Sequence, residues 1–389
     1  MSKLRVHRTR QIGALLLLLT LPLVATTSPA TKPSAEPAGQ TAGSAAGGTK
    51  SAVSEDPSGL PSEILPRASK SLLLDIVKSS DRYFAVGERG HVLRSEDGKS
   101  WTQLEVPTRS ALTSITAVDG QLWAGGHDGV IIHSADGGDS WQTQRRDPYV
   151  LAAGARPADH DPLQGAPVLD IYFTDARSGI AVGAYSLMLV THDGGATWTP
   201  KQAIAAAKAP EAPAAPMQGD IFSQEDLQLD EESDPHLNAV ASAGPGVMVI
   251  VGERGTFLRS SDGGESWQRL GFPYKGSMFG VLGLGNGHLL AYGLRGNVYE
   301  TSDLGSTWSK VETQGSASLM GGTALDNGGV VLAGVNGTLL SRPSPDAPFA
   351  ATTYKNADGE TPALSGIAPA EDGSYVLVGD KGVDLYRLQ

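Results

Sequence analysis

The chain has 389 residues, among them 49 Gly, 24 Pro and no Cys, and its formal net charge is −12. The lack of Cys excludes disulfides, thiol catalysis and cysteine-ligated metals. The negative net charge argues against a protein that binds the phosphate backbone of a nucleic acid, because such binding depends on clustered Lys and Arg. Gly is well above its usual share of about 7%, which predicts many tight turns.

The first thirty residues predict an export signal. Basic residues at positions 3, 5, 8 and 10 precede an apolar run over residues 12–25. Because a membrane span needs about 20 apolar residues, cleavage of this segment is favoured over a retained anchor, although both stay open. Residues 31–61 are rich in Pro, Ala, Gly and Ser, which predicts a disordered linker. We therefore expect an exported protein, either periplasmic or secreted.

From residue 83 onward, one pattern recurs and predicts the fold. A Gly-x-x-Gly turn, a short β-rich run and a Ser/Thr-x-Asp box follow one another, and the turns begin at residues 87, 126, 252, 293, 334 and 379. A seventh turn begins at Gly183, with Ser186 in place of the second glycine. The spacing is about 41 residues, with extra lengths near residues 143–167 and 199–236. A repeat of this length with several short strands is typical of a β-propeller. We predict an all-β chain whose residues 62–389 form seven four-stranded antiparallel blades.

The first unit illustrates the strands expected in each blade, at residues 72–77, 82–86, 91–94 and 101–106. The last unit stops after its third strand. Residues 62–68 resemble a fourth-strand segment, so we predict that they form an N-terminal strand that completes the last blade and closes the ring.

Five Asp boxes end in Trp, and Phe349 takes the Trp place in a sixth, altered box. Asp and Ser side chains satisfy backbone donors in tight turns, which predicts a structural role for the box, with its Trp packed between blades. The structural residues are predicted to be Asp97, Trp101, Asp136, Trp141, Asp193, Trp198, Asp262, Trp267, Asp303 and Trp308.

The Asp boxes are similar to those of sialidases and related propellers. The string from Gly252 to Trp267, echoed at residues 87–101, more closely resembles the photosystem II stability and assembly factor family. The resemblance covers residues 62–389. It implies a non-enzymatic, exported, seven-bladed propeller that binds protein partners and assists a membrane complex, without a cofactor. In a photosynthetic host, the compartment would resemble the thylakoid lumen.

The alternative function is that of a sialidase or glycosidase. Such an enzyme needs an arginine triad and paired carboxylates and tyrosines over the ring axis. The Arg-Ile-Pro motif of sialidases is absent, and the eight His residues show no ligand spacing, so no metal site is predicted. A purely structural secreted protein is a third possibility. We predict a binding protein rather than an enzyme.

Arg89, Arg254 and Arg295 occupy the turn between the second and third strands of three blades. This turn lies on the face opposite the Asp boxes, so the three guanidinium groups are predicted to form a rim that binds carboxylates of a partner. The alternative is that each pairs with a nearby Glu. Arg94 and Arg259, just before two Asp boxes, are included as partner-binding candidates, although pairing between blades explains them better.

Both long inserts leave the propeller on this same face. The second carries seven carboxylates between residues 220 and 234 and no Lys or Arg. It is either a solvated loop or an acidic latch that lies over the arginine rim and competes with the partner.

Overall fold

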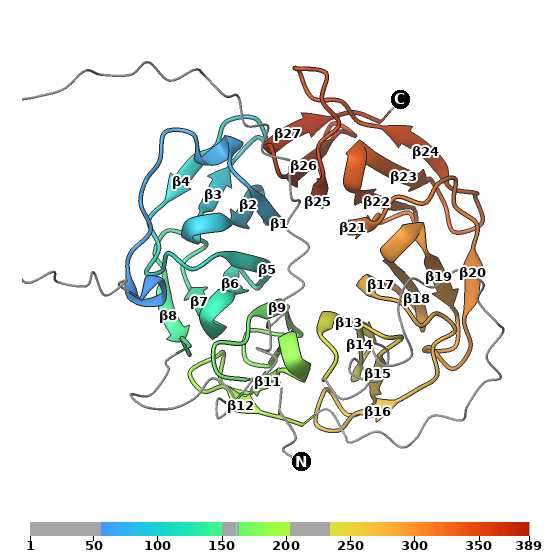
Figure 1. The fold of residues 1–389 in the computed structure, drawn as a ribbon, viewed down its shortest axis with the longest axis horizontal. Coiled ribbons are helices and arrows are strands. Elements are labelled where there is room, and N and C mark those ends of the chain that lie inside the picture. The colour runs from blue at the N-terminus through green and yellow to red at the C-terminus, as the bar shows by residue number, and fades with distance from the viewer. Residues whose placement is uncertain (1–55, 150–160, 162, 203–233, 389) are drawn as a thin grey trace, which may run out of the picture. The chain divides into compact units, whose positions relative to one another are not determined.

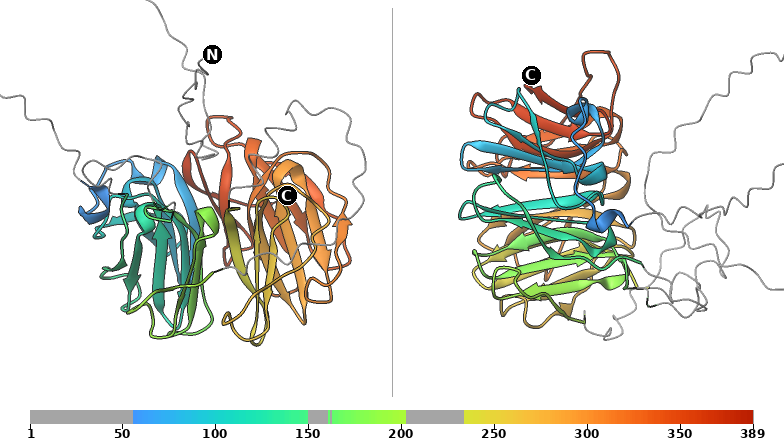
Figure 2. Two further views of the ribbon diagram at one scale, coloured as in Figure 1. Left: turned by 60° about the horizontal axis from the view of Figure 1, so that its bottom comes forward. Right: turned by 90° about the vertical axis from the view of Figure 1, so that its left-hand side faces the viewer.

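A computed structural model describes residues 56–149, 161, 163–202 and 234–388. The described part of the compact unit Ser54–Gln389 forms six four-stranded antiparallel sheets and one three-stranded sheet. The sheets follow one another around a ring, as Figure 1 shows, and Figure 2 shows the same blades from the side. The predicted seven-bladed propeller is confirmed. No helix in the described part of the chain is long and apolar enough to cross a membrane.

The first four blades have the following strands. Blade 1 contains β1 (Leu73–Ser79), β2 (Arg82–Gly87), β3 (Val92–Ser95) and β4 (Thr102–Leu104). Blade 2 contains β5 (Leu112–Val118), β6 (Gln121–Gly126), β7 (Ile131–Ser134) and β8 (Gln142–Arg145). Blade 3 contains β9 (Val168–Phe173), β10 (Gly179–Gly183), β11 (Met188–Thr191) and β12 (Thr199–Pro200). Blade 4 contains β13 (Leu237–Gly244), β14 (Val247–Gly252), β15 (Phe257–Ser260) and β16 (Gln268–Arg269).

The remaining three blades complete the ring. Blade 5 contains β17 (Met278–Gly285), β18 (His288–Gly293), β19 (Val298–Thr301) and β20 (Ser309–Val311). Blade 6 contains β21 (Leu319–Ala324), β22 (Val330–Gly334), β23 (Thr338–Arg342) and β24 (Ala350–Thr353). Blade 7 contains β25 (Leu364–Pro369), β26 (Tyr375–Gly379) and β27 (Gly382–Tyr386). Two short 3-10 helices, η1 (Pro57–Gly59) and η2 (Ala68–Lys70), precede β1.

The hydrophobic core is divided among the interfaces between neighbouring blades. The first strand of each blade lies nearest the ring axis and contacts the first strand of the next blade, including β25 against β1. Phe84 of blade 1, for example, is fully buried against Leu122 of blade 2. Alternating residues of each sheet face opposite neighbours, so second strands such as β2, β10 and β22 are buried on both faces. The ring is therefore held together by side chains that two blades share.

Each Asp box forms a tight turn between the third and fourth strands. In blade 2, the Ser134 hydroxyl accepts a hydrogen bond from Gly138 N (2.8 Å), and Asp136 Oδ1 accepts one from Ser140 N (2.9 Å). The same pattern holds Asp97, Asp193, Asp262 and Asp303. These hydrogen bonds lower the pKa of Asp97, Asp193, Asp262 and Asp303 to about 2 and lower that of Asp136 further. The box carboxylates thus act on the backbone of their own turn.

The box tryptophans pack across blade boundaries. Trp267 of blade 4 is 3% exposed, contacts the cluster that contains Ile180 of blade 3, and donates its indole N–H to Gly264 O (3.0 Å). Trp141 is also buried, whereas Trp101, Trp198 and Trp308 are half-buried against such clusters. Phe349, in the altered box, is buried beneath the Arg342 guanidinium at 5.1 Å.

The predicted closing strand over residues 62–68 is not formed. Blade 7 has three strands, and this segment lies along blade 1 instead. Ser62 N donates to Val106 O (2.8 Å), while the Gln103 side chain accepts from Leu65 N and donates to Glu63 O (both 2.8 Å). Because Gln103 already satisfies these backbone groups and Pro66 has no N–H, a ladder with β27 does not develop here.

The segment nevertheless joins the first and last blades. Ala68 is 3% exposed in the cluster that contains Val376 and Val383 of blade 7, and Leu65 packs against the same cluster. Deleting residues 1–70 should therefore lower the free energy of unfolding by roughly 2 kcal/mol more than deleting residues 1–55, since burying a Leu-sized side chain contributes about 1.5–3 kcal/mol. Urea denaturation of both variants measures the difference. Equal stability of the two variants would mean that the segment is a passive tether.

Candidate functional site

One face of the ring carries the turns between the second and third strands together with the links between blades. Gly90, at φ +69°, lies against the link to blade 2, where an added Cβ would come within 2.0 Å of Thr108 O. Gly255 N donates to Gly276 O in the next link (3.0 Å), and Asp147 N donates to Asp128 O (2.8 Å). We call this face the rim face. It is opposite the Asp boxes, and Arg89, Arg254 and Arg295 lie on it.

The third residue of these turns adopts a left-handed backbone in six blades. The residues are Arg89, Asp128, Tyr185, Arg254, Arg295 and Asn336, with φ between 53° and 58°. Asn and Asp accept this conformation more readily than other side chains that carry a Cβ. Turn geometry therefore accounts for Asp128 and Asn336 but does not explain why three blades have Arg at this place.

Two of the three rim arginines are neighbours. Arg254 belongs to blade 4 and Arg295 to blade 5, and the link between these blades places Tyr274 and Lys275 between the two turns. Burial raises the pKa of the Tyr274 hydroxyl, and the charge of nearby Arg295 partly opposes this increase. Arg295 and Lys275 are exposed, and Arg254 is half-buried. We call Arg254, Tyr274, Lys275 and Arg295 the blade 4–5 cluster.

Arg89 lies apart from this cluster, because blade 1 is three blades away from blade 4 around the ring (Figure 1). It lines a pocket of about 210 Å³ with Glu63, Leu65 and Arg109. Arg109 Nη1 is paired with Glu63 Oε1 at 2.8 Å, whereas Arg89 is exposed. The predicted arginine rim thus divides into two separate positive regions on one face.

Arg94 and Arg259 belong to the other face and contact neighbouring blades. Arg94 Nη1 is 2.6 Å from Asp139 Oδ1 in the box of blade 2. Arg259 Nη1 donates to Leu304 O (3.1 Å) and to the Ser306 hydroxyl (3.2 Å) in the box of blade 5. Each arginine joins its blade to the next Asp box, so neither belongs to the rim face.

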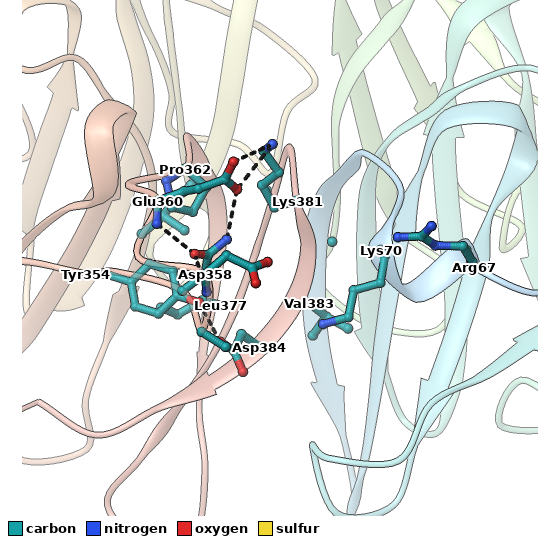
Figure 3. Close-up of a pocket in the computed structure, with 15 residues that line it drawn as sticks. Arg67, Lys70, Tyr354, Asp358, Glu360, Pro362, Leu377, Lys381, Val383 and Asp384 are labelled. Atoms are coloured by element: carbon teal, nitrogen blue, oxygen red, sulfur yellow. Dashed lines mark hydrogen bonds and ion pairs between the residues drawn. The ribbon is translucent and has the colours of Figure 1, made fainter.

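A larger pocket, of about 430 Å³, lies beside the β26–β27 hairpin of blade 7. Figure 3 shows the acidic residues Asp358, Glu360 and Asp384 on one side of it and Arg67 and Lys70 on the other. Two of the acidic residues already have partners within the pocket. Lys381 Nζ is 3.2 Å from Glu360 Oε2, and the Tyr354 hydroxyl donates to Asp384 (2.5 Å). The basic and acidic side chains that line the pocket balance each other, so the pocket does not favour a ligand of either charge.

Two carboxylates from different blades lie near the ring axis. Asp75 Oδ2 accepts from Ile115 N of blade 2 (2.9 Å), and Asp170 Oδ2 accepts from Val240 N of blade 4 (2.8 Å). Both side chains are half-buried. Burial raises the pKa of Asp75 to about 7, with a contribution from the charge of Asp170, and raises the pKa of Asp170 to about 6.

Sequence reasoning missed both carboxylates and the residues between Arg254 and Arg295. A signal was present for the carboxylates, because Leu-Asp-Ile recurs at residues 74–76 and 169–171 inside otherwise apolar first strands. Tyr274 and Lys275 lie in the link between blades 4 and 5, and the order of the strands already places this link on the rim face. The export signal and residues 220–233 of the acidic insert lie outside the described residues. Within the described ranges, no group of three or more His, Asp or Glu side chains is placed to hold a metal ion.

Two family models match separate parts of the chain. Residues 216–387 match the model described as photosynthesis system II assembly factor YCF48, and residues 44–159 match the DUF6242 beta propeller domain. A comparison with curated proteins finds no match.

Solved structures share the fold over most of the chain. YCF48 from Cyanidioschyzon merolae is 16% identical, with a TM-score of 0.56, and the alignment covers 84% of this chain and 99% of that one. The structure titled YCF48 bound to D1 peptide gives the same identity and TM-score, with 84% and 96% covered. A streptogramin B lyase is 12% identical, with a TM-score of 0.59 and 85% and 97% covered, so both binding proteins and an enzyme have this fold. This chain is a seven-bladed propeller similar to the photosystem II assembly factors, with the family match over residues 216–387.

Proposed function

We propose that this protein is an exported, non-enzymatic binding protein that assists a membrane complex, and that it holds an acidic segment of a protein partner on its rim face. The similarity to YCF48, which has been solved with a D1 peptide, supports a protein partner from such a complex. The observation that carries the binding surface is the blade 4–5 cluster, where Arg254 and Arg295 flank Lys275 on one face of an acidic protein.

The chemistry of the cluster suits carboxylates. Each guanidinium presents a planar fork of donors that matches a carboxylate, and Tyr274 adds an aromatic surface beside the Arg295 charge. Because Arg89 lies across the ring, it is a second contact for a long segment rather than part of one cluster.

The glycosidase alternative calls for carboxylates and tyrosines over the ring axis. Asp75 and Asp170 do lie there, but both oxygens of each carboxylate accept backbone N–H groups. These hydrogen bonds fix the carboxylates against the strands. A general acid in a glycosidase must instead be free to donate a proton to the glycosidic oxygen. We therefore favour binding over turnover.

The double variant Arg254→Glu, Arg295→Glu should bind the D1 peptide at least about tenfold more weakly at low ionic strength, because attraction of a carboxylate becomes repulsion. Fluorescence anisotropy measures the affinity, and pull-down from host membranes extends the test to whole partners. The melting temperature should hardly change for Arg295→Glu alone, since Arg295 is exposed and exposed substitutions usually alter stability by less than about 0.5 kcal/mol. Because Arg254 is half-buried, the melting temperature of the double variant is measured alongside its affinity.

The matched control is Lys99→Glu, Lys310→Glu, which makes the same change in net charge at two exposed lysines away from the rim face. Binding lost equally in both double variants would reflect net charge and reject the cluster as the binding site. If the parent binds neither the peptide nor any membrane protein, the proposed function itself is wrong.

A further inference from the structure

Neighbouring blades are joined near the ring axis by hydrogen bonds between their first strands, and neutral groups make most of them. The Ser114 hydroxyl accepts from Ile171 N of blade 3 (3.1 Å), in the same way that Asp75 and Asp170 accept from the next blade. Three further side chains donate to a carbonyl of the next blade: Thr113 to Val168, Asn238 to Met278 and Ser365 to Leu73. A negative charge is therefore not needed to join two blades.

The two carboxylates carry that charge without a partner cation. Asp170 acts on Asp75 across the ring, and no cationic side chain in the described ranges contributes to the pKa of either one. Two carboxylates in a poorly solvated place repel each other, which costs stability unless a positive group lies nearby. Their position needs an explanation beyond the joining of blades.

Tyr292 supplies an independent observation. It lies on β18 of blade 5 and is only 5% exposed, and its hydroxyl makes no hydrogen bond with the described residues. The hydroxyl comes within 2.2 Å of the place where a Cβ on Gly280 would stand. Gly280 follows a register shift in the first strand of blade 5, as Asp75 does in blade 1.

The Tyr292 hydroxyl therefore stands at the level of the two carboxylates, and their negative charges both act on it. The hydroxyl is not among the buried polar atoms that lack a partner, so it opens to the space at the axis and can exchange hydrogen bonds with a group placed there. Blades 1, 3 and 5 thus direct three oxygen groups toward the axis, while Gly321 and Gly366 leave blades 6 and 7 without side chains at this level.

We infer that the ring axis binds a cation that presents several hydrogen-bond donors, held by Asp75, Asp170 and Tyr292. Both oxygens of each carboxylate already accept a backbone N–H, and Asp170 Oδ1 also accepts from the Ser114 hydroxyl (2.9 Å). The lone pairs that remain suit donors from a hydrated ion or an ammonium or guanidinium group rather than a tight metal cage. Such a cation offsets the repulsion between the carboxylates and gives the Tyr292 hydroxyl a partner. The site is separate from the rim face and independent of the proposed function.

Isothermal titration of the full chain at low ionic strength tests this site with four probes: Mg²⁺, Ca²⁺, ethylammonium and methylguanidinium. Saturable binding of Mg²⁺ or Ca²⁺ would identify a hydrated metal ion as the cation that occupies the site. Binding of the organic probes alone would identify a basic side chain of a partner. If none of the four binds, the inference is wrong.

Two variants locate the site. Tyr292→Phe should weaken binding by roughly tenfold, because it removes one hydrogen bond to a charged ligand, yet it should leave the melting temperature of the ligand-free protein equal or higher. Asp170→Ser, which copies the neutral acceptor Ser114, should abolish binding. The matched control is Tyr299→Phe, a buried phenol of the same blade away from the axis. Unchanged affinity in Tyr292→Phe, or equal loss in Tyr299→Phe, would contradict the assignment.

Discussion

Replacing Asp75 with Asn is expected to remove a large part of the dependence of stability on pH between about pH 4 and pH 7. The folded protein raises the pKa of this carboxyl from 3.8 to about 7, mainly by burial and further by the charge of Asp170. The folded state therefore binds the proton more tightly than the unfolded state does. This contribution to stability is complete below pH 4 and is lost as the pH rises through 7.

The expected size follows from the shift. Each unit of pKa difference corresponds to about 1.4 kcal/mol, so Asp75 can contribute roughly 4 kcal/mol across this window, reduced by whatever solvent its half-buried carboxylate retains. The parent should lose stability relative to Asp75→Asn as the pH rises from 4 to 7, when urea denaturation is followed at several pH values. Comparison with the variant matters because the lowered pKa values of buried histidines such as His91 act in the opposite direction.

Asp97→Asn is the matched control. Hydrogen bonds within its turn lower the pKa of Asp97 to about 2, so its contribution to stability is lost only as the pH falls below about 4. This control should therefore leave the slope between pH 4 and pH 7 as it is in the parent. A parallel pH profile for the parent and Asp75→Asn would mean that the carboxyl is ionised freely in the folded protein.

The seven blades were predictable from the sequence because each one repeats its own turn chemistry. Gly at positions such as 90 and 255 permits the left-handed turns, and Asp and Ser of the boxes satisfy local backbone donors. These interactions lie within one unit, so the pattern of residues encodes them directly. The face on which Arg254 and Arg295 lie follows from the same local topology.

Contacts between units were harder to predict. The failure of residues 62–68 to form a strand depends on Gln103, whose side chain occupies the backbone groups of this segment. The approach of Tyr292 to the ring axis depends on the missing side chain of Gly280 on a neighbouring strand. Neither arrangement has a repeat or a spacing that signals it, because each arises from one pair of residues that the ring brings together.

Trp267→Ala is expected to cause the largest loss of stability among the box tryptophans, about 3–5 kcal/mol. Its ring is 3% exposed and lies between blades 3 and 4, where it contacts the cluster of Ile180 and Met248. Removing it leaves a cavity that both blades line, and a ring of blades cannot close over it without shifting its neighbours. Thermal and urea denaturation measure the loss.

Trp198→Ala provides the comparison, since this half-buried indole takes the same place in its own box and should cost less. Trp267→Phe should recover part of the loss, because an aromatic ring would still fill the space against Ile180, while the indole hydrogen bond to Gly264 O would be missing. Both substitutions lie on the face opposite the blade 4–5 cluster, so folded variants should bind the D1 peptide as the parent does. Equal and small losses for Trp267→Ala and Trp198→Ala would show that the blades are joined mainly by their first strands, and the box would then act on its own turn alone.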